Sequence, residues 1–311
     1  MPAFKTYRRR FPATSANLGP GFDTAALAFD MWLTVEAEPA AEMVIAATGR
    51  DAALCASQKN NLVIETYCSI LEAEGVLPPP IAIRMFNDIP LGMGCGSSAA
   101  GLFAAITLAV HFGNLGWSDE RILEEGCARE GHPDNASACW LGGVVVAATE
   151  GRKVHVARFA PPKQWRALVA IPVEPLATSK ARALLPQSYS RADVVANLQS
   201  ATLLGPAFGL GRADLVRVAM RDKIHQPYRA ALCPLLPRLL PLAGTSGILG
   251  VALSGAGPSV LLVLESENCE REVRSAVENA LAGGEEAELR LLQFTGEGAV
   301  SGLIPSFSSS K

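Results

Sequence analysis

The sequence predicts a mixed α and β fold divided between two domains, and three observations support this prediction. The chain has 311 residues, and a prior of roughly 150 residues per domain suggests two domains or one large one. Segments with helical periodicity alternate with short apolar segments typical of strands. The pair Pro161-Pro162 interrupts this pattern near the middle of the chain. We therefore place a boundary near residue 160, with domains over residues 1–160 and 161–311.

In the first half, local signals support both helices and strands. Ile81, Ile83 and Met85 alternate with their neighbours, as on one face of a strand, and Ser118 stands where an N-cap residue is expected. The predicted helices cover residues 61–73, 98–112 and 119–129, and the predicted strands cover residues 81–86 and 143–148.

The second half repeats the mixture. A glycine-rich turn separates two apolar segments that are typical of buried strands. The predicted helices cover residues 194–204, 213–220 and 267–282, and the predicted strands cover residues 248–253 and 260–264. The serine-rich tail over residues 306–311 is expected to fray.

Composition and charge describe an ordinary globular protein. Hydrophobic residues make up 49% and charged residues 18% of the chain, and 27 basic against 30 acidic side chains give a net charge of −3. Binding to nucleic acid or to an acidic membrane needs a concentrated surplus of lysine and arginine, so neither is expected as the main partner. The basic run from Arg8 to Arg10 is interpreted as a solvated strand end.

Cysteine usage and hydropathy bear on the compartment. The seven cysteines include no CxxC pair and are odd in number, so we expect reduced thiols rather than a disulfide framework or a zinc site. The N-terminus reaches Phe11-Pro12 without the apolar stretch of a secretory leader, and prolines interrupt the leucine-rich segment 232–242. We therefore expect a cytoplasmic protein that does not span a membrane.

A glycine-rich turn over residues 90–100, PLGMGCGSSAA, lies between a predicted strand and a predicted helix. Glycines allow backbone N–H groups to surround phosphate oxygens, and the positive end of the helix dipole favours the same charge. The neighbouring hydroxyls of Ser97 and Ser98 could bind magnesium or cap the helix. The pattern is neither a Walker A loop nor a Rossmann fingerprint, and a purely structural turn remains the alternative.

Three other segments concentrate polar or small residues, and each has an ordinary structural interpretation. Residues 12–23, PATSANLGPGFD, form a small-residue loop that could be only an Asx-rich turn. Residues 253–259, LSGAGPS, could be a tight hairpin. Residues 130–135, EGHPDN, could be helix caps.

Together these segments resemble the GHMP kinases, whose motifs occur in this order. A finer resemblance, to the homoserine kinases within that superfamily, rests on PATSANLGPGFD at 12–23, EGHPDN at 130–135, TSKARALLP at 178–186 and DKIHQPYR at 222–229. The resemblance covers nearly the whole chain. Cys95 departs from it, because leucine is usual there.

The resemblance implies an α+β, two-domain fold: an N-terminal α/β domain with a left-handed βαβ unit, and a C-terminal ferredoxin-like domain, with the site between them. The implied reaction transfers the γ-phosphate of ATP, with magnesium, to the side-chain hydroxyl of L-homoserine. Its product is O-phospho-L-homoserine, on the route to threonine. The resemblance also allows a homodimer.

The resemblance further implies a role for each matching position. Nucleotide binding falls to Asn61, Pro90, Gly92, Gly94, Gly96, Ser97 and Ser98. Magnesium binding falls to Ser98 and Glu130, with Glu124 and Glu125 as alternatives to Glu130. Homoserine binding falls to Asn17, Asp23, His132, Asn135, Thr178, Arg182, Arg229 and Gly255. Asp23 and Thr178 are the candidates for orienting the hydroxyl, Asp134 is the rival general base, and His225 is interpreted as structural.

The charges in these motifs favour one substrate class over others. A zwitterionic amino acid needs an acid for its ammonium group and a cationic fork for its carboxylate, which Asp23, Arg182 and Arg229 can supply. Mevalonate and sugars lack the ammonium group. A kinase for one of those alcohols, and a non-catalytic sensor that binds ATP, remain the alternatives.

Overall fold

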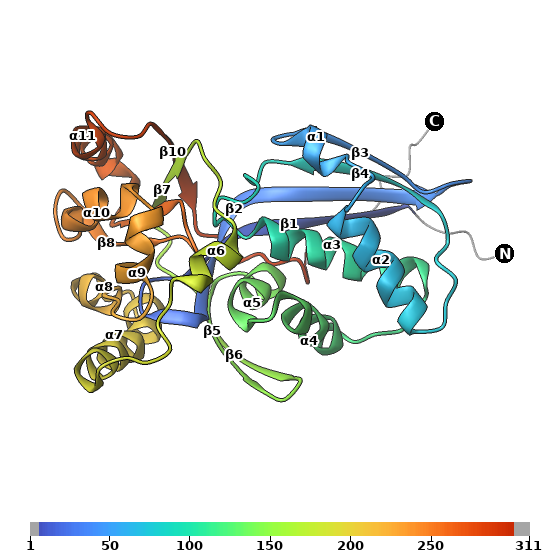
Figure 1. Cartoon of the computed structure of the whole chain (residues 1–311), viewed down its shortest axis with the longest axis horizontal. Coiled ribbons are helices and arrows are strands. Elements are labelled where there is room, and N and C mark those ends of the chain that lie inside the picture. The colour runs from blue at the N-terminus through green and yellow to red at the C-terminus, as the bar shows by residue number, and fades with distance from the viewer. Residues whose placement is uncertain (1–5, 302–311) are drawn as a thin grey trace.

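The computed structural model describes residues 6–301 and contains two sheets, each covered by helices. Figure 1 shows the first half of the chain on the right and most of the second half on the left. The strands of the first sheet follow the order β3-β4-β2-β5-β6, and β1 also pairs with β2. Its strands are β1 (Tyr7–Asn17), β2 (Gly21–Pro39), β3 (Val44–Gly49), β4 (Ile81–Asn87), β5 (Val144–Glu150) and β6 (Lys153–Phe159).

The hairpin of β1 and β2 corrects the loop that the sequence predicts over residues 12–23. Strand pairing continues to Asn17 opposite Gly21, and only residues 18–20 form the turn. Pro12 is tolerated because β1 pairs on one side only, and the register shifts between Pro12 and Ala13. The small residues that suggested a loop are instead buried, and they pair with the strand that follows directly after the turn.

The basic run lies at the start of β1 and is half-buried rather than fully solvated. The Arg8 guanidinium pairs with Glu36 at 3.0 Å. The Arg9 guanidinium lies 5.4 Å from the Trp140 ring centre, and that of Arg10 lies 4.2 Å from the Trp32 ring centre. Contacts within the protein therefore engage this run, and it does not form an open basic patch.

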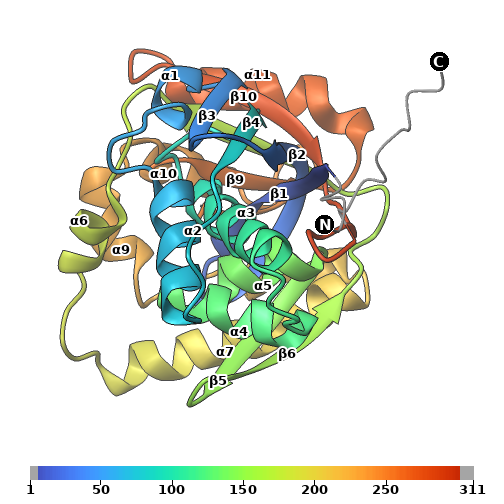
Figure 2. The ribbon, with the colours of Figure 1, turned by 90° about the vertical axis from the view of Figure 1, so that its right-hand side faces the viewer.

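Helices cover one face of the first sheet, as Figures 1 and 2 show. The three helices predicted in the first half are confirmed, and Ser118 accepts a hydrogen bond from the Arg121 N–H, as an N-cap residue does. The parallel strands β3 and β4 are joined through α1 and α2, so they form a βαβ unit. These helices are α1 (Ala52–Cys55), α2 (Leu62–Ala73), α3 (Ser97–Phe112), α4 (Asp119–Glu130) and α5 (Pro133–Leu141).

Alanine and glycine let α3 pack deep in the core. Nearly every side chain from Ala99 to Ala109 is buried, since small residues allow close approach on all sides. On its far side Phe103 stacks on Trp140 with ring centres 5.2 Å apart. The N-terminus of this rigid helix is thereby held at a fixed place beside the glycine-rich turn.

The second sheet has the order β10-β7-β9-β8, with every neighbouring pair antiparallel. Strands and helices alternate as in a ferredoxin-like βαββαβ unit, which confirms that prediction. The strands are β7 (Arg166–Pro172), β8 (Ile248–Leu253), β9 (Val260–Leu264) and β10 (Ala287–Gln293). The helices are α6 (Thr178–Ala183), α7 (Arg191–Gly209), α8 (Ala213–Ala219), α9 (Gln226–Arg229), α10 (Leu235–Leu239) and α11 (Glu270–Leu281).

Several segments of the second half bond directly to the first, and two backbone hydrogen bonds illustrate this. The Gly255 N–H, in the turn after β8, donates to the Ala16 carbonyl at 3.1 Å. The Thr295 N–H, after β10, donates to the Ala28 carbonyl at 3.0 Å. The predicted boundary near residue 160 falls between β6 and β7 and stays a prediction.

Within residues 6–301, no helix is both long and apolar enough to span a membrane. The serine-rich tail at 306–311 lies outside the described residues.

Candidate active site

One cavity of about 570 Å³ brings together residues from both halves of the chain. Its wall combines the glycine-rich turn, the β1–β2 hairpin, the α4–α5 connection, α6, α9 and the turn after β8. The predicted site residues that line it are Asn17, Asp23, Asn61, Gly92, Gly94, Gly96, Ser97, Ser98, Glu130, His132, Asn135, Thr178, Arg182, Arg229 and Gly255. Pro90 is buried and does not line the cavity, so its predicted contact with nucleotide is not supported.

The glycine-rich turn has two separate reasons for its glycines. Gly92, Gly94 and Gly96 have φ of +71°, +75° and +72°, a region that disfavours side chains. A Cβ on Gly94 would lie 2.1 Å from the Ser254 carbonyl oxygen, and one on Gly96 would lie 1.9 Å from the Thr14 hydroxyl. Gly96 occupies the N-cap position of α3 with no side-chain cap, so the first N–H groups of that helix stay available to an anion.

Asn61 lines the cavity, and its predicted contact with adenine stays a prediction, but its side chain already has a structural role. Its side-chain oxygen accepts from the N–H groups of Val63 and Ile64 at 3.0 and 3.3 Å, which caps α2. Its amide nitrogen donates to the carbonyls of Cys55 and Ser57 at 3.0 and 2.7 Å. With these bonds satisfied, the side chain shapes the cavity wall.

An apolar end of the cavity was not predicted from the sequence. It lies next to the glycine-rich turn and is provided by β2, β4, the segment after β4 and the start of α3. A flat heterocyclic ring fits such a surface, because burying apolar area is favourable and needs few directed contacts. Its lining side chains are Leu33, Met85, Ile89 and Leu102.

Ser98 and Glu130 meet at the mouth of the glycine-rich turn. The Ser98 hydroxyl donates to Oε2 of Glu130 at 3.0 Å, and burial raises the pKa of the Glu130 carboxyl. Two close oxygen donors beside the anion site suit magnesium, a hard cation that also neutralises phosphate charge. Glu125 instead pairs with Arg129 and Arg152. Glu124 does not line this cavity. Of the three glutamates, the geometry favours Glu130.

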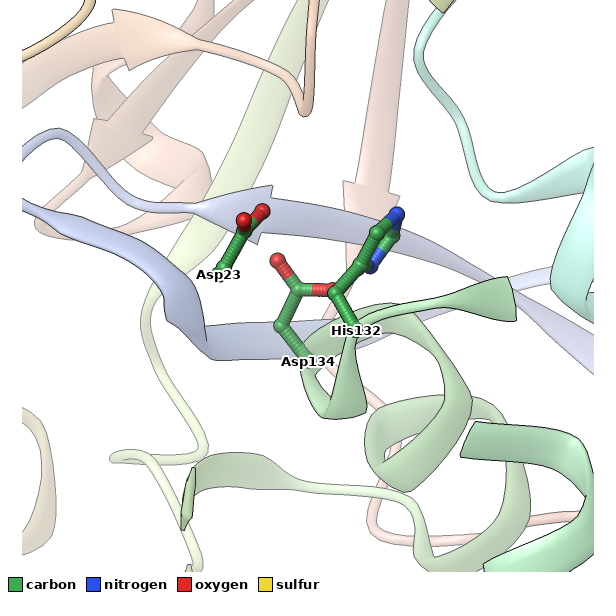
Figure 3. A group of neighbouring side chains, drawn as sticks. All are labelled: Asp23, His132 and Asp134. Atoms are coloured by element: carbon green, nitrogen blue, oxygen red, sulfur yellow. The ribbon is translucent and has the colours of Figure 1, made fainter. Parts of the chain in front are cut away.

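His132 and Asp134 form a pair at the junction of α4 and α5, shown in Figure 3 with Asp23 nearby. His132 Nδ1 lies 2.5 Å from Oδ1 of the buried Asp134, which also accepts from the Asn135 N–H at 2.6 Å. Burial lowers the pKa of His132, but the hydrogen bond and charge of Asp134 outweigh it, and the net shift is upward. Both contacts are made by Oδ1 of Asp134, and its role as the rival general base stays a prediction.

Asp23 and Arg182 pair with each other across the cavity. Arg182 donates to both Asp23 oxygens, at 2.9 and 2.5 Å, and this bond raises the arginine pKa. Asn17 supports the acid: its side-chain oxygen accepts from the Asp23 N–H at 3.1 Å, and its amide donates to the Gly255 carbonyl at 2.8 Å. The predicted acid and one predicted cation are therefore adjacent, and each compensates the charge of the other.

Arg229 is almost fully buried, with 1% of its surface exposed. Burial and the nearby Arg182 lower the pKa of its guanidinium. The Phe22 ring lies beside both cations, 5.2 Å from the Arg182 guanidinium and 5.3 Å from that of Arg229. Such contacts partly offset the desolvation of the arginines. Phe22 was missed from the sequence, although it stands next to Asp23 in the quoted motif.

The remaining predicted residues differ in how firmly they are held. The Asn135 side-chain oxygen accepts from the Thr14 hydroxyl at 2.7 Å, which ties α5 to β1. Thr178 is exposed in the first turn of α6 and lines the cavity. His132 occupies the N-cap position of α5 without a side-chain cap bond, so the capping interpretation is not supported.

Comparison with known proteins agrees with this geometry. Family models described as the GHMP kinases N-terminal and C-terminal domains match residues 61–143 and 203–283. A homoserine kinase of Solibacter usitatus is 43% identical over 260 residues, 83% of this chain and 85% of that protein. One of Desulfitobacterium hafniense is 37% identical over 292 residues, 94% of this chain and 98% of that protein.

A solved structure shows the same fold. The crystal structure of homoserine kinase from Cytophaga hutchinsonii has a TM-score of 0.79 at 24% identity, covering 94% of this chain and 96% of that one. Together with the relatives above, this establishes the family. The chain belongs to the GHMP kinases and, within them, to the homoserine kinase family.

Proposed function

We propose that the protein transfers the γ-phosphate of ATP to the side-chain hydroxyl of L-homoserine and releases O-phospho-L-homoserine and ADP. The observation that carries the proposal is one cavity that joins an uncapped helix N-terminus to an acid and two arginines. The helix N-terminus suits phosphate, whereas the acid and the two arginines together suit a zwitterion. The homoserine kinase relatives support the same assignment.

On this proposal, the substrate exchanges partners with a pre-existing ion pair. Its ammonium group takes the place of the Arg182 guanidinium at Asp23, and its carboxylate takes the place of Asp23 at Arg182 and also contacts Arg229. A ligand with only one of the two charges would open the pair and leave one partner uncompensated, which is unfavourable in a partly buried site. The pair thus favours zwitterions over mevalonate or sugars.

At the other end of the cavity, the turn at Gly92, Gly94 and Gly96 holds the phosphates through backbone N–H groups. The apolar end receives the adenine ring. Ser98 and Glu130 would hold magnesium, which neutralises charge on the transferring phosphoryl group when bound. The burial of Glu130 fits this role, because an isolated buried carboxylate is unfavourable without a cation.

Alignment rather than a strong base is proposed to carry the transfer. A loose phosphoryl-transfer transition state places little demand on deprotonation of the hydroxyl before attack. Asp23 bonds to Arg182 in the free protein and to the substrate ammonium group in the proposed complex. Orientation of the hydroxyl therefore falls mainly to Thr178, assisted by the His132–Asp134 pair. Positioning two reactants in this way can account for about 7–11 kcal/mol of a barrier.

A substrate panel tests the proposal. Purified protein is incubated with ATP, magnesium and either homoserine, mevalonate, galactose, threonine or serine, and ADP release is measured together with phosphorus NMR of the product. Homoserine should give the highest kcat/KM and a phosphomonoester on its side-chain oxygen. Preference for mevalonate or galactose would contradict the substrate assignment, and ATP binding without turnover on any alcohol would indicate a sensor.

A further inference from the structure

His225 is a fully buried histidine that does not line the cavity but lies directly behind Arg229, which does. It occupies the N-cap position of α9 but makes no capping bond with its side chain. Nε2 lies 2.7 Å from the Gly19 carbonyl oxygen, and Nδ1 lies 3.1 Å from Nη1 of Arg229. The imidazole therefore joins the β1–β2 turn of the first half to an arginine of the second.

The two partners dictate where the hydrogen of His225 resides. An arginine N–H can only donate, so Nδ1 must carry a lone pair, and a carbonyl can only accept, so Nε2 must carry the hydrogen. Asp222 is 3.6 Å from Nε2, but its oxygens already accept from the N–H groups of Ile224, His225 and Gln226. Burial lowers the pKa of His225, consistent with a neutral ring.

The bond from Arg229 to His225 is the shortest that the guanidinium makes within the described chain. Its other hydrogen bonds are longer, 3.4 Å to the Ala181 carbonyl and 3.5 Å to the Gly255 carbonyl. Nη2 makes no hydrogen bond to any residue in the range 6–301, so its N–H groups remain for a ligand. His225 thus sets the rotation of the fork while leaving one edge open.

We propose that His225 is a positioning residue for substrate recognition. Because it bonds to both the Arg229 guanidinium and the Gly19 carbonyl, it fixes the position of Arg229 relative to the β1–β2 turn and therefore relative to Asp23. The distance between the carboxylate and ammonium subsites is thereby set across the two halves of the protein. This inference rests on the proposed function, in which Arg229 contacts the carboxylate of homoserine. Nothing in the mechanism requires His225 itself to touch substrate.

Three substitutions separate the two bonds. His225→Phe fills the space but removes both, His225→Gln can retain a donor towards Gly19, and His225→Asn can retain an acceptor towards Arg229. We expect His225→Phe to raise homoserine KM at least about tenfold with ATP KM unchanged within about twofold. His225→Asn should recover more of the homoserine KM than His225→Gln. His155→Phe, on the exposed strand β6, is the matched control and should behave as wild type.

A double-substitution cycle shows whether His225 acts through Arg229. In an Arg229→Ala background, His225→Phe should raise homoserine KM by less than about twofold further, because the group that it positions is absent. Equal effects in both backgrounds, or an unchanged homoserine KM in folded His225→Phe, would overturn the inference. If Arg229→Ala alone leaves homoserine KM unaltered, the proposed carboxylate subsite has failed as well, so the two failures are distinguishable. Thermal unfolding of each variant confirms folding, and His225→Asn provides the test if His225→Phe does not fold.

Discussion

The two ends of the cavity recognise charge in different ways. At the glycine-rich turn, recognition depends on backbone N–H groups, and the side chains that matter are the absent ones at Gly92, Gly94 and Gly96. At the amino-acid end, recognition depends on long charged side chains, each held by another part of the protein. On the proposed function, the first end binds the phosphates of the nucleotide and the second selects the alcohol that receives the phosphoryl group.

This difference predicts which substitutions should impair both folding and nucleotide binding, and which should change the kinetics of one substrate only. Gly94 and Gly96 have positive φ and no room for a side chain, so substitution at either position acts on structure and nucleotide together. A charged side chain can be shortened without moving the backbone, so its loss should appear in the kinetics of one substrate. Substitutions at the two ends of the cavity test this contrast between backbone and side-chain recognition.

Gly94→Val should abolish measurable ATP binding. The new Cβ would lie 2.1 Å from the Ser254 carbonyl oxygen, and a β-branched residue is strongly disfavoured at a φ of +75°. Because this contact couples the glycine-rich turn to the turn after β8, a lower melting temperature is expected too. Calorimetric titration with ATP checks the prediction, and wild-type affinity in the folded variant would refute the phosphate assignment.

Gly92→Ala separates an effect on ATP affinity from an effect on folding better than Gly94→Val does. An added Cβ there meets only the Pro175 side chain, at 3.2 Å. Its conformational strain should cost about 1–2 kcal/mol. ATP affinity should therefore weaken in a protein that still folds and is destabilised by no more than this amount. Homoserine binding, measured without nucleotide, should be unaffected if the two ends of the cavity are as separate as the comparison implies.

Much of the fold follows from local sequence signals, and the exceptions depend on strand pairing and burial in the folded protein. The α4 helix could be predicted because its N-cap residue Ser118 and its apolar spacing are local. The β1 strand could not, because Pro12 and a run of small residues become a strand only when β2 pairs beside them. The β7 strand was also missed: every residue after Arg166 is buried, so it lacks the alternation that marks a strand with one solvated face.

The site was predictable where a motif specifies chemistry and not where three-dimensional contacts reassign a side chain. The resemblance supplied Arg182 and Arg229, and both line the cavity. It could not show that Asp23 and Arg182 pair with each other, since they are 159 residues apart in sequence. Phe22 and His225 gain importance only from the guanidinium groups beside them, and no local pattern signals that.

Arg229→Ala should have the next largest effect, confined to the amino-acid substrate. Loss of a buried cation that pairs with a carboxylate is expected to cost about 2–5 kcal/mol. That corresponds to roughly 30- to several-thousand-fold in kcat/KM for homoserine. Steady-state kinetics should place most of the loss in homoserine KM, with ATP KM nearly unchanged.

Arg182→Ala should lower kcat/KM for homoserine by at least about tenfold, which is less than the loss expected for Arg229→Ala. The Arg182 side chain is 36% exposed, so water partly replaces it when it is removed. Lysine at either position should restore only part of the loss, since the planar fork is missing. If both arginines can be replaced by alanine with homoserine KM unaltered in a folded protein, the carboxylate binds elsewhere.

Ser98→Ala and Glu130→Gln should impair transfer more than nucleotide binding. Each removes an oxygen donor of the proposed magnesium site, and a loss of at least about tenfold in activity is typical when groups around a metal site are changed. The deficit should shrink as magnesium concentration rises, which activity measured across a magnesium titration would reveal. Glu124→Gln on the same helix is the control. Normal turnover by Ser98→Ala at sub-saturating magnesium would leave Ser98 without a role in binding the metal.

Asn61→Ala should have the smallest effect on catalysis, although its position borders the apolar end of the cavity. The side chain caps α2 and ties it to the carbonyls of Cys55 and Ser57, so its removal leaves two helix N–H groups and two carbonyls without their partner. Loss of an N-cap residue typically costs about 0.5–2 kcal/mol of stability. We expect a lower melting temperature, a modest rise in ATP KM and an unchanged homoserine KM.

Asn61→Asp should recover the bonds from Val63 and Ile64 but not those to the two carbonyls, and so should be intermediate in stability. Because capping is independent of the ligand, ATP should raise the melting temperature of Asn61→Ala by nearly as much as it raises that of wild type. A variant of wild-type stability that has lost this ATP-dependent increase would instead identify Asn61 as a direct adenine contact.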